Sequence, residues 1–148
     1  MTANKQPIYT SVPDIGFVVI GAQNTKSDGT GTIGTDLWKA FTAGANGSYI
    51  SKIRLNPTAS VAASALAATV VRVFLSSQTS GATTTANTFL VGEYALGAQT
   101  ADQTTTATFP IDIPMGFAIP ANWTVLCSTH IVNNANTAWV AAVYGGDY

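Results

Sequence analysis

Short apolar stretches recur along the chain, and segments rich in Gly, Ser, Thr and Asn separate them. The clearest is Ser48–Asn56, where the odd-numbered positions, from Tyr49 to Leu55, share one face of a predicted strand. The basic residues Lys52 and Arg54 share the other face. A period of two is typical of a half-buried strand. The predicted strands, in chain order, are Gly16–Ala22, Thr32–Thr42, Ser48–Asn56, Thr69–Leu75, Thr88–Leu96, Thr104–Ile113, Trp123–Val132 and Thr137–Tyr144.

About eight regularly spaced strands, with no long helix, predict an all-β domain. Turn residues between such strands favour a single β-sandwich. Eight strands in two sheets of four is the number found in a jelly roll. A closed barrel is the alternative arrangement of the same strands.

The segment Phe109–Asn122 carries the most specific local pattern, a proline at each end of a short apolar step. Proline donates no backbone hydrogen bond, so we expect the strand entering this segment to stop at Pro114. A turn at Pro120–Asn122 then starts the next strand. This order predicts a link that crosses from one sheet of the sandwich to the other.

Two further segments depart from the strand pattern. Residues 1–15 contain Pro7 and Pro13 and predict an extended N-terminal arm, which leaves 16–148 as the jelly-roll domain. Ala59–Ala68 has helical spacing of Ala and Leu, yet it equally fits a loop or an extended edge.

Composition narrows the class of function. Hydrophobic residues make up 47% of the chain and charged residues only 9%, against about 25% charged residues in a typical soluble domain. A surface with so little charge repulsion suits a protein that packs against neighbours. The six Lys and Arg residues form no basic stripe, so we expect no nucleic-acid partner.

No apolar stretch is long enough to predict a membrane span, and the N-terminus lacks the apolar core of a signal peptide. We therefore expect no membrane partner and synthesis in a cytoplasm. The single cysteine, Cys127, lies among apolar residues and predicts a buried thiol.

Catalytic and metal-binding patterns are scarce. Cys127 and the single histidine, His130, are three residues apart on one predicted strand, so their side chains point to opposite faces and form no nucleophilic pair. The seven acidic residues lie far apart in sequence, and no Cys or His pair predicts zinc. We expect neither an enzyme nor a cofactor or metal. The loop Asp28–Gly31 is the one weak calcium pattern, and it is more typical of a turn.

Tryptophans give the one small-ligand hypothesis. Trp38, Trp123 and Trp139 would stack on sugar rings if they were exposed on one sheet face. The alternative is that they are core or interface anchors of a small sandwich.

Several segments, in this order, resemble the jelly-roll head decoration (cement) proteins of tailed bacteriophages. They are Gln6–Ile15, Tyr49–Leu55, Val71–Leu75, Phe109–Asn122 and Val143–Tyr148. The resemblance covers nearly the whole chain and depends on the order of segments, since no single motif is diagnostic.

The resemblance implies a non-enzymatic virion protein on the outer capsid surface, a homotrimer that binds the major capsid protein. It implies that the arm reaches a neighbouring subunit or the shell. On position alone we expect interface roles for Ile8, Tyr9, Pro13 and Tyr148. A phage tail, baseplate or head-fibre module and a carbohydrate-binding module remain the alternatives.

Overall fold

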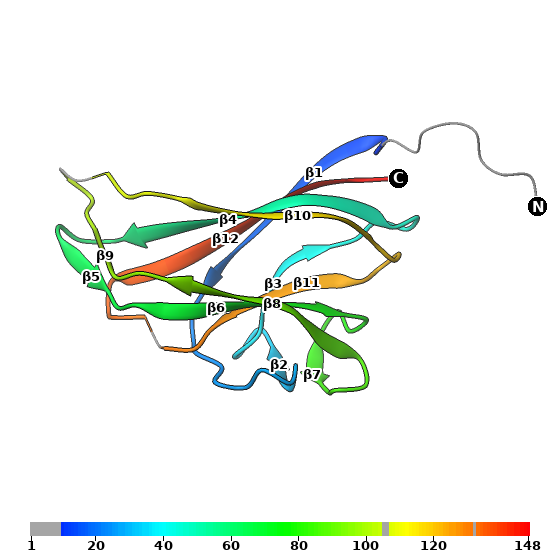
Figure 1. The fold of residues 1–148 in the computed structure, drawn as a ribbon, viewed down its shortest axis with the longest axis horizontal. Helices are drawn as coiled ribbons and strands as arrows, with labels where there is room; N and C mark the ends of the chain where they lie inside the picture. The colour runs from blue at the N-terminus through cyan, green and yellow to red at the C-terminus, as the bar shows by residue number, and fades with distance from the viewer. Residues whose placement is uncertain (1–9, 105–106, 132) are drawn as a thin grey trace, which may run out of the picture.

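The protein forms a sandwich of two four-stranded antiparallel sheets (Figure 1). The structure is a computed structural model, and it describes residues 10–104, 107–131 and 133–148. The first sheet has the order β1 (Val12–Ile20), β12 (Thr137–Asp147), β4 (Ser48–Ala59) and β10 (Ile111–Ile119). The second has the order β3 (Trp38–Thr42), β11 (Thr124–Thr129), β6 (Thr69–Ser76) and β8 (Thr88–Leu96). Two small pairs complete the described fold: β2 (Gly31–Ile33) with β7 (Gly81–Thr83), and β5 (Ser64–Leu66) with β9 (Gln99–Ala101).

The pairing of the eight long strands is that of a folded double ribbon. β1 pairs with β12, β3 with β11, β4 with β10, and β6 with β8, so each strand of the first half meets one of the second half in reverse order. Wrapping such a nested ribbon into two sheets gives the jelly-roll topology. The prediction of an all-β jelly-roll sandwich is confirmed, and the two separate sheets exclude the closed barrel. Within the described chain, no helix is long and apolar enough to cross a bilayer.

The main core lies between the sheets and is built from the inward-facing residues of both. Trp139 is its largest fully buried side chain, and Ile53, Leu55, Val73 and Val125 are fully buried with it. A second, smaller cluster lies on the outer face of the second sheet. It consists of Leu37, Phe74 and Leu126, with Ile33 and Leu90 packed against it. Ile33 belongs to β2, so the β2–β7 pair covers part of this outer face, as its position below the sheet in Figure 1 shows.

β10 does not end at Pro114, as the sequence predicted. The strand continues to Ile119, and its pairing with β4 shifts between Pro114 and Phe117. Proline is tolerated there because β10 is an edge strand, and Gly116 takes the left-handed conformation (φ 71°) within the irregularity. The predicted strand Thr104–Ile113 overlaps β10 only from Ile111 onward. The chain crosses between sheets later, at Pro120–Trp123, where the predicted turn is present and Asn122 has a φ of 62°.

Three other sequence predictions are corrected. Ser51 has no directly opposed residue where the pairing of β4 with β12 shifts, so Tyr49 points outward and does not share the face of Leu55. Ala59–Ala68 contains bends and the strand β5, so its helical alternative is wrong. Val12–Ile15, assigned to the arm, belong to β1 and pair with β12.

Candidate interaction face

The outer face of the first sheet is a regular surface with an apolar half and a charged half. Directly opposed residues of antiparallel strands share a face, so the pairing defines its rows. Across β1, β12 and β4 the rows are Ile15–Tyr144–Lys52, Phe17–Ala142–Arg54 and Val19–Val140–Asn56. The residues between these positions, such as Val143 and Ala141, are fully buried and face the core.

The apolar half is centred on the edge strand β1. Ile15, Phe17 and Val19 are 58%, 72% and 49% exposed, and together they form a stripe along its outer side. Val140 and Ala142 on β12 extend the same surface and are half-buried. Four of the nine most exposed large hydrophobic residues described belong to β1, because Val12 is also 57% exposed. A concentration of exposed apolar side chains is typical of an interaction surface.

The charged half is centred on Asp112 of β10. Lys52 Nζ lies 2.9 Å from Asp112 Oδ2, and Arg54 Nε lies 2.6 Å from Asp112 Oδ1. Hydrogen bonds from Arg54 and then Lys52 hold the pKa of the Asp112 carboxyl well below its usual range. The same bond raises the pKa of Arg54. The ammonium of Lys52 also lies 5.1 Å from the ring centre of Tyr144, so it joins the charged half to the apolar half.

Part of the outer face of the second sheet is covered by the chain itself. The β2–β7 pair lies over Phe74, and beside it Arg72 is almost fully buried. Arg72 Nε lies 2.5 Å from Glu93 Oε1, and its Nη1 donates to the backbone oxygen of Asn24 at 3.2 Å. The same Nη1 lies 3.4 Å from His130 Nδ1, which acts as the acceptor because a guanidinium only donates. Arg72 therefore links the loop before β2, through Asn24, to the second sheet.

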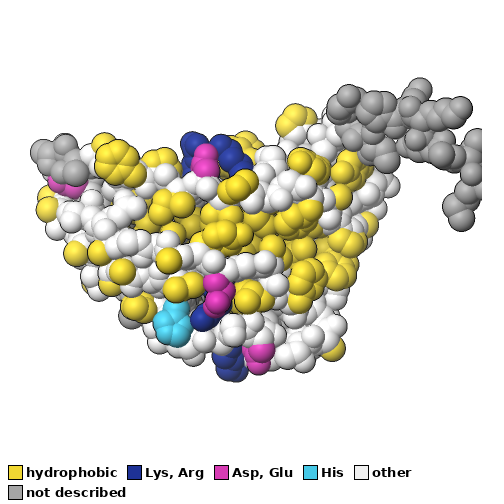
Figure 2. Space-filling model, viewed as in Figure 1, with side chains coloured by type: hydrophobic (Ala, Val, Ile, Leu, Met, Phe, Trp, Pro, Cys, Tyr) yellow, Lys and Arg dark blue, Asp and Glu magenta, His cyan; other side chains and the backbone are white. Residues whose placement is uncertain are grey.

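A second apolar area follows the side of the sandwich where β10 and β8 are the sheet edges. Figure 2 shows hydrophobic side chains in a band across this level, with the charged side chains confined to small groups. Most of these residues are half-buried against the core, as Val91 and Phe117 are. Phe89 is 50% exposed and meets Trp123 edge to face, with 6.2 Å between ring centres. Apart from Phe89, the residues named here are less exposed than the stripe on β1.

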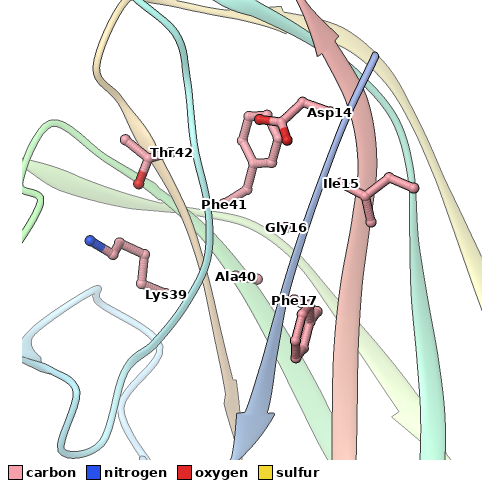
Figure 3. A pocket seen from close by; sticks show the side chains of 8 residues that line it. All are labelled: Asp14, Ile15, Gly16, Phe17, Lys39, Ala40, Phe41 and Thr42. Atoms are coloured by element: carbon pink, nitrogen blue, oxygen red, sulfur yellow. The ribbon is translucent and has the colours of Figure 1, made fainter.

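An open pocket of about 270 Å³ lies between the edge strands β1 and β3 (Figure 3). Asp14 and Phe17 come from β1, and Lys39 and Thr42 come from β3. The strands approach closely because Gly16 has no side chain: a Cβ there would lie 2.1 Å from the backbone oxygen of Ala40. The pocket holds one acidic and one basic side chain, from different strands.

The structure does not bring the three tryptophans together on one sheet face. Trp139 is fully buried in the core, so its predicted role in sugar stacking is wrong. Trp38 is half-buried on β3 and donates from Nε1 to the backbone oxygen of Ala22 at 3.0 Å. Trp123 packs against Phe89 at the far end of the β10–β11 turn. Trp139 is therefore a core anchor, which is the alternative role considered for the tryptophans.

The residues predicted for an interface divide into two pairs. Ile8 and Tyr9 lie outside the described residues. Pro13 is exposed at the start of β1, and Tyr148 is half-buried, with its backbone N–H donating to Gly47 at 3.2 Å. Whether any of them contacts a partner stays a prediction. Sequence reasoning missed the exposed stripe on β1, because residues 17–20 form an unbroken apolar run in which outward and inward positions look alike.

Cys127 is fully buried, as the sequence predicted, and burial raises the pKa of its thiol to about 12. His130 lies on the outer side of the second sheet and is exposed. Within the described ranges, no group of three or more His, Cys, Asp or Glu side chains is placed to hold a metal ion.

No protein-family model matches the chain, and no curated protein matches it. Among solved structures, the chain is similar to the VP2 subviral particle of infectious bursal disease virus, at 12% identity and a TM-score of 0.31. It is also similar to the structure of infectious bursal disease virus Gx strain, at 11% identity and a TM-score of 0.27. Each match covers 97% of this chain and 36% of the other, so the chain spans about a third of those proteins. These values are too low to carry a functional argument.

Proposed function

We propose that this protein is a non-enzymatic structural protein of a bacteriophage virion, which decorates and stabilises the outer surface of the capsid. The observation that carries the proposal is the asymmetry of the sandwich. The chain's own β2–β7 pair covers part of one outer face, whereas the other outer face, the open face, presents an uncovered apolar stripe beside a compact charged cluster. A domain with this asymmetry is suited to dock by the open face.

Low charge supports the same proposal. With 9% charged residues, the protein has little charge repulsion to oppose close packing of many copies. Weak contacts are then sufficient, because a particle offers many equivalent sites and linked contacts reinforce one another. The sequence resemblance to head decoration proteins adds the outer capsid surface and the major capsid protein as the proposed location and partner.

The proposal is tested by sedimenting the purified protein with assembled shells that lack it. We expect the protein to pellet with shells and to ignore unassembled coat protein. Ala142→Arg places a long charged side chain at the centre of the open face and should keep the protein in the supernatant. Ala95→Arg, at an exposed position on β8, is the matched control and should pellet normally.

A wild-type protein that stays in the supernatant would overturn the docking role, and so would equal pelleting of both variants. Antibody labelling of intact particles separates this location from the alternative: labelling of the tail, baseplate or head fibre would replace the decoration role by one in those structures.

A further inference from the structure

The outer edge of β1 lacks the features by which the other sheet edges avoid pairing. Edge strands present unpaired backbone groups and are normally protected by charge, proline, bulges or short length. β10 carries Asp112, Pro114 and an irregular register, and β8 carries Glu93 and a register shift. β3 is only five residues long, carries Lys39 and also has a shifted register.

β1 differs from these edges along most of its length. Its nine residues pair with β12 in unbroken register. Pro13 and Asp14 stand at its beginning, and no charged residue or proline follows from Ile15 to Ile20. The outer side of this same stretch carries the exposed stripe Ile15, Phe17 and Val19. A long, regular and apolar edge is a template for another strand.

We propose that β1 pairs with β1 of a second copy of this chain, antiparallel and about a two-fold axis at Phe17. The two first sheets then form one continuous eight-stranded sheet. This register places Phe17 opposite Phe17 and Ile15 opposite Val19 of the other copy, so all three exposed apolar positions meet on one face. A shift by one residue would bring outward positions opposite inward ones. A shift of the axis to Val18 would place Ile15 opposite Gly21, which has no side chain, and a shift to Gly16 would place Val19 opposite Pro13, which has no backbone N–H.

β3 lies against β1 and runs opposite to it, because Gly16 lies against Ala40 and Gly21 lies against Trp38. The Lys39 side chain points away from β1 (Figure 3), and its ammonium donates to the backbone oxygen of Thr79 at 3.1 Å. The match to a second copy is therefore carried by the regular edge of β1 and by its three exposed apolar positions.

Solution mass is the first test, and it needs no shells. The pairing of β1 rests on and deepens the proposed assembly role, but it involves only copies of this chain. A failure to bind shells would therefore not contradict it. Light scattering should give twice the 15.3 kDa of one chain. Phe17→Lys should reduce the mass to that of a single chain, and Phe89→Lys, at the other exposed strand phenylalanine, should leave the pair intact. A wild-type mass of one chain, or of three as the family resemblance implies, overturns the pairing.

Cysteine cross-linking tests the register, and it remains decisive if Phe17→Lys fails to fold. Opposed residues of antiparallel strands have Cα atoms about 5 Å apart, which is within disulfide range. Phe17→Cys should therefore form a covalent pair on oxidation. Ile15→Cys should not, because the two copies of that residue would lie about 13 Å apart. The native Cys127 is buried and does not compete. Equal cross-linking of both variants, or cross-linking of Ile15→Cys alone, overturns the two-fold axis at Phe17.

Discussion

Phe74→Ala tests whether the outer face of the second sheet is sealed by the β2–β7 pair. Phe74 is fully buried with Leu37 and Leu126, although it points away from the main core. If the β2–β7 pair and the sheet enclose a small core, the change of Phe74 to alanine removes a fully buried ring and leaves a cavity. Such substitutions cost about 3–5 kcal/mol of the free energy of unfolding.

Phe109→Ala is the matched control, since Phe109 is 77% exposed. Less than a quarter of that side chain is removed from water, so the same chemical change should cost less than about 1 kcal/mol. The two variants are compared by urea unfolding, monitored by far-ultraviolet circular dichroism. With a slope of about 2 kcal/mol per molar urea, Phe74→Ala should lower the midpoint by about 2 M and Phe109→Ala by less than about 0.5 M.

The comparison is made at several protein concentrations, because self-association raises apparent stability by mass action. A loss below about 1.5 kcal/mol for Phe74→Ala would show that Phe74 does not lie in a sealed core under the β2–β7 pair. The β2–β7 pair would then be a loose loop that shields nothing, and both outer faces of the sandwich would count as open.

Three further predictions concern single residues. Carbon-detected titration of Asp112 should give a midpoint well below the usual 3.8, because its basic neighbours hold the folded pKa down. Stability from this group is therefore present above the unfolded pKa and is lost as pH falls through the folded value; an ordinary midpoint would contradict the ion cluster. Gly16→Ala should cost about 1–3 kcal/mol, because the new methyl group meets the oxygen of Ala40. Gly97→Ala, where a Cβ meets nothing within 4 Å, should be nearly neutral in the same unfolding assay. Cys127 should resist thiol reagents at pH 8 until the protein unfolds, and rapid labelling of the folded protein would show that its burial is wrong.

The strand pattern could be predicted from the sequence because each long strand carries its own periodicity. Turn residues such as Asn122 also mark their positions locally, since Asn tolerates a positive φ. The irregularities could not be predicted in the same way. Whether Pro114 ends a strand depends on the strand being at an edge, and whether Tyr49 faces inward depends on an unpaired residue at Ser51. Both are decided by the neighbouring strands.

The interaction face was hidden from the sequence for a related reason. β1 is apolar at every position from Phe17 to Ile20, so its outward residues are indistinguishable from core residues until the sheet order is known. The same holds for Trp139, whose position near a strand start left exposure open. The ion pairs of Arg72 with Glu93 and of Arg54 with Asp112 join strands that are distant along the chain. Their residues therefore show no local spacing that would predict the contact.

The docking role of the open face is tested most directly by hydroxyl-radical footprinting of the protein, free and bound to shells. We expect Tyr144 and Tyr49, on the outer side of the first sheet, to lose labelling on the shell and Phe89, on an edge of the second sheet, to keep it. Unchanged labelling of both tyrosines in shell-bound protein, or protection confined to Phe89, would contradict docking by this face.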